Sequence, residues 1–304
     1  MAYKHRSIGL VLGGGGARGA AHIGALKVLH DNGIEFDKIV GTSAGAVIGA
    51  MYAGSKDPDW MITRFKEFVK SDEFKKTRVK SVRPDKNPDS VFSQMSRFVH
   101  NQFVIAMAIN KESIIEKKIL KDAIEFLMPV KDFNELLVPL SVVCTDLNSG
   151  ETIVYDEGDL IEAVVQSASI PGFVEPTLIN GRRIVDGGVT DPFPIHVIKG
   201  SVDFILGVNI SRSYPKPLKK ANIIEIITRT EMITSLKLSE ALVKQADFVI
   251  KPDTMGLHWS EFQEIEKLIN NGAEAVERSL PELIIELEKK PSLKQRISQL
   301  LGVS

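Results

Sequence analysis

Residues 7–19 read SIGLVLGGGGARG, and this short stretch decides the fold. Its first six residues are mostly apolar and predict a strand, and four glycines follow directly. Residues 20–30 then place apolar side chains at helical spacing. A strand, a glycine loop and a helix in this order bring backbone N–H groups together at the positive end of the helix, where no Cβ obstructs them. The stretch therefore predicts an α/β fold with a site for negative charge at the loop.

The rest of the chain repeats this alternation of short apolar strands and helical patterns. A second helix is predicted at 44–52, and further strands at 36–40, 138–145, 152–155, 183–185, 204–209 and 248–251. Such alternation is typical of a mostly parallel sheet with helices on both faces. Residues 60–132 lack a convincing strand and predict a helical insertion, with an amphipathic stretch at 92–109. From residue 261 onward we expect two or three amphipathic helices, punctuated by Pro281 and Pro291.

Length and composition are those of a globular protein with a sizeable core. The 304 residues are 43% hydrophobic and 25% charged, and the formal net charge of -1 predicts no nucleic-acid partner. The single cysteine, Cys144, excludes an intramolecular disulfide and lies in an apolar run, so we interpret it as a buried structural thiol. The apolar run at 7–12 is too short for a signal-peptide core or a membrane span, and we expect a cytoplasmic protein.

Residues 64–86 form a local basic stretch, with nine Lys or Arg against four Asp or Glu. A solvated helical face explains such a stretch. A surface for anionic lipid headgroups is the alternative, and it makes a peripheral contact with membranes a hypothesis.

A second loop carries the pattern of a nucleophile. Residues 41–45 read GTSAG, between a predicted strand and a predicted helix. In such a tight turn the glycines remove steric conflict and the hydroxyl of Ser43 projects above the sheet, while the N–H of Ala44 lies at the helix start. Because both loops follow the carboxyl ends of strands, their N–H groups can surround a carbonyl oxygen under attack. Ser43 is therefore the predicted nucleophile.

The glycine loop also matches the G-x-G-x-x-G pattern of dinucleotide-binding proteins, through Gly14, Gly16 and Gly19. That fold needs an acidic residue at the carboxyl end of the second strand. Glu35 and Asp37 have the right spacing but lie at the beginning of that strand, whose end carries the serine turn instead. We therefore disfavour dinucleotide binding. A phosphate-binding P-loop is also disfavoured, because no Gly-Lys-Ser or Gly-Lys-Thr follows the glycines.

A serine nucleophile needs a base, and histidine is the usual one. His196, ten residues beyond Asp186, is the histidine that suits a triad. His22 lies just inside the helix after the glycine loop, where it either shapes that loop or packs as an ordinary helix residue.

Asp186 is the better candidate for the base. It ends a short apolar strand and precedes two glycines, which permit close backbone approach. An ordinary carboxylate is a poor base at neutral pH, so this role requires partial desolvation that raises the pKa of Asp186. Two competing carboxylates, each of which is more simply a turn former, are Asp146 and Asp191.

Together these motifs resemble the patatin-like phospholipase family, over roughly residues 7–210. The resemblance implies a three-layer α/β/α fold in a single domain that spans residues 1–304, with the helical insertion at about 60–132 and a helical tail at about 261–304. It implies that Ser43 and Asp186 form a Ser-Asp dyad without a catalytic histidine. On the glycine loop and the serine turn, it implies an oxyanion hole made by Gly14, Gly15, Gly16 and Ala44, with Arg18 and Gly19 shaping the loop.

The resemblance further implies hydrolysis of ester bonds in phospholipids, lysophospholipids or related acyl lipids. It requires no cofactor and no metal, and the sequence predicts no protein partner. The segment after residues 186–188 lacks the paired asparagines common in plant members, which favours the bacterial branch. Residues 167–172 resemble a recurrent family segment whose serines we interpret as structural. Arg18 either braces the loop or meets a phosphate.

Two alternative functions remain open at this point. The same acyl-enzyme permits acyl transfer to an acceptor other than water. A regulatory protein that senses acyl lipids without turnover is the second alternative.

Overall fold

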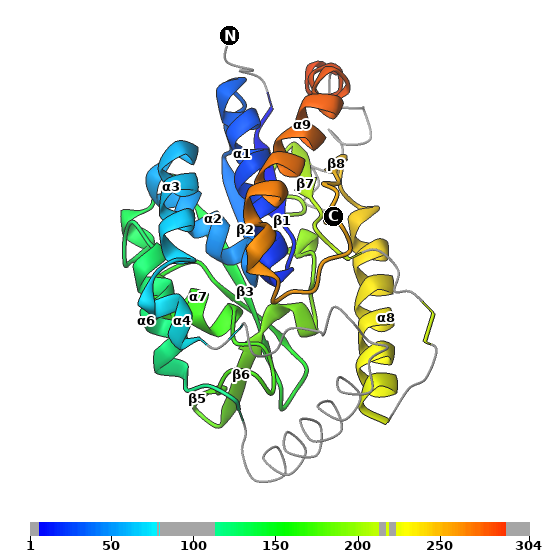
Figure 1. Ribbon diagram of the computed structural model, residues 1–304. Helices are drawn as coiled ribbons and strands as arrows, with labels where there is room; N and C mark the ends of the chain where they lie inside the picture. Colours follow the sequence, from blue (N-terminus) through cyan, green and yellow to red (C-terminus); the bar gives the residue numbers. More distant parts are fainter. Residues whose placement is uncertain (1–5, 78, 80–112, 213–216, 219–222, 290–304) are drawn as a thin grey trace.

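The computed structural model describes residues 6–77, 79, 113–212, 217–218 and 223–289 (Figure 1). Within these ranges an eight-stranded sheet forms the centre, in the order β5-β6-β3-β2-β1-β7-β8, with β4 beside β3. The strands are β1 (Ile8–Leu12), β2 (Lys38–Thr42), β3 (Leu140–Asp146), β4 (Thr152–Tyr155), β5 (Thr177–Ile179), β6 (Arg182–Asp186), β7 (Phe204–Val208) and β8 (Phe248–Ile250). In this spatial order, the pairs β3–β2, β2–β1, β1–β7 and β7–β8 are parallel. The pairs β3–β4, β3–β6 and β5–β6 are antiparallel.

Helices cover the sheet as two unequal layers. The longer ones are α1 (Ala20–Asp31), α2 (Ala44–Ser55), α3 (Pro58–Phe68), α6 (Lys117–Leu127), α7 (Leu160–Ser167), α8 (Ile223–Val243) and α9 (Ile265–Glu288). The short ones are α4 (Asp72–Lys76), η1 (Gly16–Gly19), η3 (Phe133–Glu135), η4 (Gly187–Val189), η5 (Ile195–Val197) and η6 (Phe262–Glu264). Across the described ranges, none of these helices has the length and apolar character needed to cross a bilayer.

Alternate residues of the strands divide the core between the two layers, because successive side chains of a strand point to opposite faces. Leu10 and Leu12 of β1 pack in the larger cluster, with residues of α1, α2, α7 and α9. Val11, between them, packs on the other face with Phe193 and with Val243 at the end of α8. This arrangement confirms the three-layer α/β/α fold.

The edge of β3 determines where the ends of two other strands lie. Val142 pairs with β2 on one side and β4 on the other, and Cys144 pairs with β4 and β6. A strand has only two edges, so β2 and β6 share the edge opposite β4. Thr42, the last residue of β2, is opposite Val143, and Asp186, the last residue of β6, is opposite Cys144. The two strands run toward each other, and their carboxyl ends meet at this edge.

Several details differ from the sequence-based expectations. The sequence predicts neither the strand β5 nor the helices α7 and α8, and the sheet is mixed because three of its strands pair antiparallel. The predicted break at Pro281 is wrong, because α9 continues through it. Leu283 and Leu287, beyond the proline, are buried and hold that part of the helix against the core. The amphipathic stretch at 92–109 and Pro291 lie outside the described residues. Cys144 is buried in β3, as predicted.

Helices α1 and α9 pack side by side on the same face of the sheet (Figure 1). Their backbones approach closely at two glycines. A Cβ on Gly24 of α1 would lie 1.8 Å from the carbonyl oxygen of Ile269, and one on Gly272 of α9 would lie 2.0 Å from the carbonyl oxygen of Ala21. No side chain can yield to relieve these contacts, because both involve backbone atoms. The two helices can therefore pack this closely only with glycine at the crossing.

We predict that Gly24→Ala lowers the free energy of unfolding by about 1–3 kcal/mol, because the added methyl group forces α1 away from α9. Helix propensity alone would raise stability by about 1 kcal/mol in the same substitution. Urea denaturation followed by circular dichroism measures the difference. Asn270→Ala, at an exposed position of α9, is the control and should be neutral or slightly stabilising. A Gly24→Ala protein as stable as the parent would contradict the close crossing.

Candidate functional site

Ser43 occupies a strained turn between β2 and α2. Its φ of 54° and ψ of -122° are unusual for a residue with a side chain. The turn is so tight that a Cβ on Gly41 would lie 2.4 Å from the carbonyl oxygen of Gly45, and one on Gly45 would lie 2.1 Å from that of Leu12. These contacts explain the glycines of the GTSAG pattern. The turn holds the Ser43 hydroxyl at the carboxyl edge of the sheet.

The hydroxyl of Ser43 donates a hydrogen bond of 2.6 Å to Oδ2 of Asp186. Asp186 ends β6, so the meeting of β2 and β6 on the edge of β3 brings the two residues together across 143 positions of sequence. The other carboxylate oxygen, Oδ1, accepts the N–H of Gly188 at 2.7 Å. Both side chains are buried. The carboxylate is thus fixed in position, with one oxygen directed at the serine.

Burial makes Asp186 a stronger base than an ordinary aspartate. Desolvation raises its pKa from 3.8 to about 6, although the hydrogen bonds from Ser43 and Gly188 act in the opposite direction. The carboxylate is still mostly ionised at neutral pH. A base of this strength in contact with a hydroxyl can accept its proton during a nucleophilic attack.

The glycine loop leaves a small set of backbone donors available. The N–H of Gly14 donates to the carbonyl oxygen of Pro192 at 3.0 Å and is therefore engaged within the protein. In the described part of the chain, no acceptor is recorded for the N–H groups of Gly15 and Gly16. Gly16 and Ala44, which is the first residue of α2, line the same pocket as the nucleophile. These donors can meet an oxyanion formed beside Ser43.

Arg18 folds back onto the glycine loop. Its Nε donates to the carbonyl oxygen of Gly15 at 3.0 Å, and burial beside Arg212 lowers the pKa of Arg18 to about 10. The N–H of Ala17 donates to the carbonyl oxygen of Trp259, which anchors the far side of the loop. Gly19 lies so near α2 that its Cβ would be 2.8 Å from the Cβ of Ala44. The loop is therefore braced from several directions.

His22 is fully buried, and its Nε2 lies 2.9 Å from the carbonyl oxygen of Gly13. Burial lowers the pKa of His22 to about 4, so the ring is neutral at physiological pH. Because a carbonyl only accepts, the neutral ring carries its hydrogen on Nε2 and donates to Gly13. This contact connects α1 to the start of the glycine loop.

His196 pairs with Asp191, whereas the hydroxyl of Ser43 bonds Asp186. Nδ1 of His196 is 3.1 Å from Oδ2 of Asp191, and 52% of the histidine side chain is exposed. Asp146 accepts the N–H of Asn148 in its own turn and the N–H of Arg183 in β6. Of the histidines and carboxylates considered from sequence, the structure brings Asp186 into contact with Ser43. Over the described ranges, no group of three or more His, Cys, Asp or Glu could hold a metal ion.

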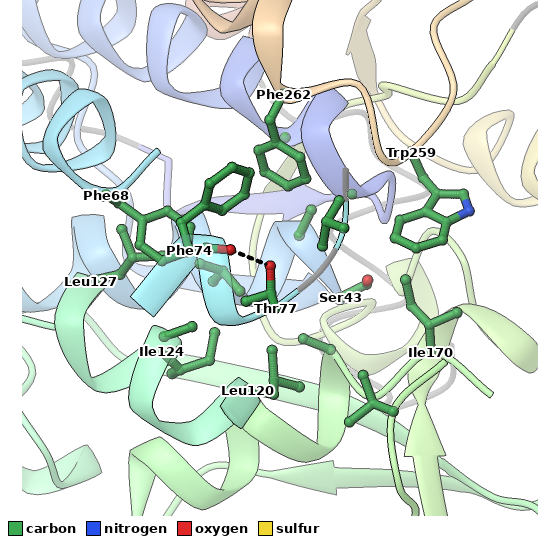
Figure 2. A pocket seen from close by; sticks show the side chains of 18 of the residues that line it. Ser43, Phe68, Phe74, Thr77, Leu120, Ile124, Leu127, Ile170, Trp259 and Phe262 are labelled. Atoms are coloured by element: carbon green, nitrogen blue, oxygen red, sulfur yellow. Dashed lines mark hydrogen bonds between the residues drawn. The ribbon is translucent and has the colours of Figure 1, made fainter. Parts of the chain in front are cut away.

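An apolar pocket of about 120 Å³ opens beside Ser43 (Figure 2). Helices α2, α3, α4 and α6 and the loop around Trp259 form its walls. Thr77 adds a hydroxyl to the wall, but that hydroxyl donates to the carbonyl oxygen of Phe74 at 2.6 Å. The pocket suits a hydrocarbon chain attached to a carbonyl group at Ser43.

Ser167 is a residue whose direct contact with the site could not be read from sequence. Its hydroxyl accepts the N–H of Ser43 at 2.9 Å and donates to the carbonyl oxygen of Val143 at 2.6 Å. It thereby ties the strained turn to β3. From the sequence we interpret the serines of residues 167–172 as structural, but no local pattern indicates a contact that spans 124 positions.

Comparison with known proteins places these features in a family context. The model of the family "Patatin-like phospholipase" matches residues 10–199, which is more than half of the chain. The match begins within β1 and includes the glycine loop, the serine turn and Asp186.

Relatives occur in bacteria and in eukaryotes. An uncharacterised NTE family protein of Mycobacterium tuberculosis is 28% identical over 215 residues, which cover 70% of this chain and 52% of that protein. A lysophospholipase of Aspergillus fumigatus is 29% identical over 208 residues, or 67% of this chain and 12% of the fungal protein. The chain thus spans about half of the mycobacterial relative and a small part of the fungal one. The expected place in the bacterial branch stays a prediction.

Among solved structures, human GIVD cytosolic phospholipase A2 resembles this chain with a TM-score of 0.54. The likeness covers 93% of this chain and 60% of the human protein, at 11% sequence identity. Identity this low supports a common fold and nothing more specific.

We predict that Ser167→Ala lowers stability by about 1–3 kcal/mol, because it removes the acceptor of the buried Ser43 N–H and a donor to the carbonyl oxygen of Val143. The released turn should also slow the labelling of Ser43 by a fluorophosphonate. Ser169→Ala is the matched control, since that buried hydroxyl bonds only the carbonyl oxygen of Val165 in α7. Urea denaturation and labelling rates measure both effects. Equal behaviour of the two variants would contradict a positioning role for Ser167.

Proposed function

Because the chain belongs to the patatin-like phospholipase family, we propose that it is a lipid acyl hydrolase that works through a Ser43-Asp186 dyad. One observation carries the proposal. The Ser43 hydroxyl donates a 2.6 Å hydrogen bond to a buried carboxylate, and an apolar pocket opens beside the pair. The first residue supplies a nucleophile, the second a base, and the pocket a place for an acyl chain.

In the first half of the reaction, Ser43 Oγ attacks the carbonyl carbon of the ester while Oδ2 of Asp186 accepts the hydroxyl proton. The carbonyl oxygen becomes an oxyanion and accepts hydrogen bonds from the N–H groups of Gly15, Gly16 and Ala44. Gly14 contributes to the shape of the loop, because Pro192 already occupies its N–H. Collapse of the intermediate breaks the ester C–O bond, and Asp186 returns the proton to the departing alcohol.

In the second half, water attacks the acyl-enzyme. Asp186 accepts a proton from the water, and the same backbone donors stabilise the second oxyanion. The bond between the acyl carbon and Ser43 Oγ then breaks, Asp186 returns the proton to Ser43 Oγ, and the carboxylic acid is released. No step requires a histidine, a cofactor or a metal, because one carboxylate performs every proton transfer.

The pocket and the relatives support an acyl lipid as the substrate. The lining is almost entirely apolar, which favours a hydrocarbon chain over a polar group. The fungal relative is a lysophospholipase, and the family name refers to phospholipids. We therefore extend the proposal to phospholipids, lysophospholipids and related acyl esters. A peripheral membrane contact through the basic stretch at 64–86 remains a hypothesis.

We predict that a fluorophosphonate probe labels Ser43, as located by mass spectrometry. Ser43→Ala should abolish the adduct and lower the hydrolysis of p-nitrophenyl esters at least about 1,000-fold. Asp186→Asn should lower hydrolysis about 100- to 10,000-fold while the protein stays folded, because the base is lost and its shape is kept.

His196→Ala is the control for the dyad and should keep the parent activity, since His196 contacts Asp191 and not Ser43. If His196→Ala is the inactive variant, the dyad assignment is wrong. Labelling without turnover would favour the lipid-sensing alternative. Product formation that depends on an added alcohol or thiol would favour acyl transfer.

The raised pKa of Asp186 predicts a pH profile. The base acts only when ionised, so kcat/KM should rise with pH through a midpoint of about 6 and level off above it. Below the midpoint it should fall about tenfold per pH unit. Measuring kcat/KM from pH 4.5 to 8.5 on a neutral ester tests this. The same midpoint in His196→Ala would assign it to the carboxylate, whereas its disappearance there would assign it to the histidine.

A further inference from the structure

The apolar pocket extends from Ser43 along two helices that lead in the same direction. Helix α2 begins directly after Ser43. Near its other end, a Cβ on Gly54 would lie 2.7 Å from Pro129, two residues beyond the last residue of α6, Leu127. The far ends of α2 and α6 are therefore neighbours.

The near end of α6 lies toward the glycine loop. Ile115, two residues before α6, donates its N–H to the carbonyl oxygen of Phe173 at 3.0 Å. The ring of Phe173 packs on Trp259 with 5.1 Å between centroids, and the backbone of Trp259 accepts the N–H of Ala17. Helix α6 therefore starts beside the reactive end of the pocket and leads away from it.

Three side chains of α6 line the pocket at successive depths. Leu120, Ile124 and Leu127 have the spacing i, i+4 and i+7, which places them on one face of the helix. Figure 2 shows them in that order along the wall, with Leu120 nearest Ser43 and Leu127 farthest. One helical turn is about 5.4 Å, so the three side chains mark depths over about 10 Å.

Aromatic rings close the far end of the pocket. Phe68 and Phe74 pack edge to face with 5.3 Å between centroids, and Phe74 and Phe262 do so at 5.0 Å. Figure 2 places Phe68 and Phe74 beside Leu127, on the side away from Trp259. Phe68 and Phe74 are buried, so the rings form a wall and not a flexible exit.

The size of the pocket limits what can enter. A cavity of about 150 Å³ lined by apolar side chains accommodates a molecule such as benzene, with its six carbon atoms. The pocket here measures about 120 Å³. By this comparison it holds about four to six carbon atoms without rearrangement of its walls.

We propose that this pocket measures the acyl chain, with α6 as the graded wall and the Phe68–Phe74 pair as the stop. The proposal rests on the function proposed above and adds the class of substrate. Esters of short to medium chains, with about four to six carbons beyond the carbonyl, bind fully inside. Longer chains must displace the aromatic wall or leave methylene groups in water, and each methylene left in water lowers the affinity about fourfold.

The test is the chain-length profile of kcat/KM for p-nitrophenyl esters from acetate to palmitate, at a fixed detergent concentration. The parent protein should be most active on pentanoate to heptanoate, which have four to six carbons beyond the carbonyl, and at least about tenfold less active on laurate and palmitate. Leu127→Phe should lower the ratio of octanoate to acetate hydrolysis, because the larger side chain fills only the deep end. Leu120→Phe should lower even the ratio of butyrate to acetate.

The control is Leu137→Phe, the same substitution at an exposed position outside the pocket, which should keep the parent profile. If circular dichroism shows that Leu120→Phe or Leu127→Phe does not fold, Ile124→Phe takes its place. Its effect on the chain-length profile should lie between those of the other two. Phe68→Ala should move the optimum to longer chains by removing part of the stop.

A parent profile that is flat to palmitate would overturn the proposal, as would substitutions that lower all chain lengths by the same factor. Fluorophosphonate labelling of Ser43 shows which of the two hypotheses is wrong, the measuring pocket or the proposed hydrolase function. Labelled, active protein with no chain-length dependence refutes the measuring pocket alone. Protein that neither labels nor hydrolyses any ester refutes the proposed function itself.

Discussion

The shared edge of β3 is the constraint from which the site follows. Strands β2 and β6 approach each other along this edge, and their last residues face the neighbouring positions Val143 and Cys144. Backbone hydrogen bonds hold both strands, so the residues that follow them cannot drift apart. The 2.6 Å contact between Ser43 and Asp186 is the consequence. Other contacts around the site involve the same edge of β3. Ser167 connects the serine turn to Val143, and η4 begins directly after Asp186.

The parts of the site that depend on local physics could be predicted from sequence. A strand that ends in glycines and opens a helix is recognisable within about 15 residues, and so is the serine turn. Asp186 could be predicted because its strand and its glycines are also local. The hydroxyl of Ser167, the antiparallel course of β6 and the wall made by α6 depend on contacts between distant segments. Periodicity and spacing contain no signal for them. The break predicted at Pro281 failed because tertiary packing outweighed the helix-breaking tendency of proline.

The geometry of the site lowers the stability of the folded state, and the packing of the surrounding structure offsets this loss. A positive φ at a residue such as Ser43 costs about 1–3 kcal/mol. Burial raises the pKa of Asp186 from 3.8 to about 6, so its ionised form lowers the stability of the fold by about 3 kcal/mol near neutral pH. That cost is absent well below pH 3.8 and complete above about pH 6, because the folded state binds the proton more tightly. The same desolvation that weakens the fold makes the carboxylate basic, so stability and basicity cannot be increased together at this position.

The reactive residues and the wall of the pocket come from different elements of the fold. The groups proposed for bond breaking come from β2, β6 and the loops that follow them, whereas the deep wall of the pocket comes from α3, α4 and α6. The side chains of Leu127 and Phe68 pack in the apolar core, and neither residue takes part in the strand pairings that position Ser43 and Asp186. Substitutions in these helices can therefore change the shape of the pocket while Ser43 and Asp186 keep their positions. In a fold built this way, a few exchanges of one hydrophobic residue for another are enough to give related proteins different substrate preferences.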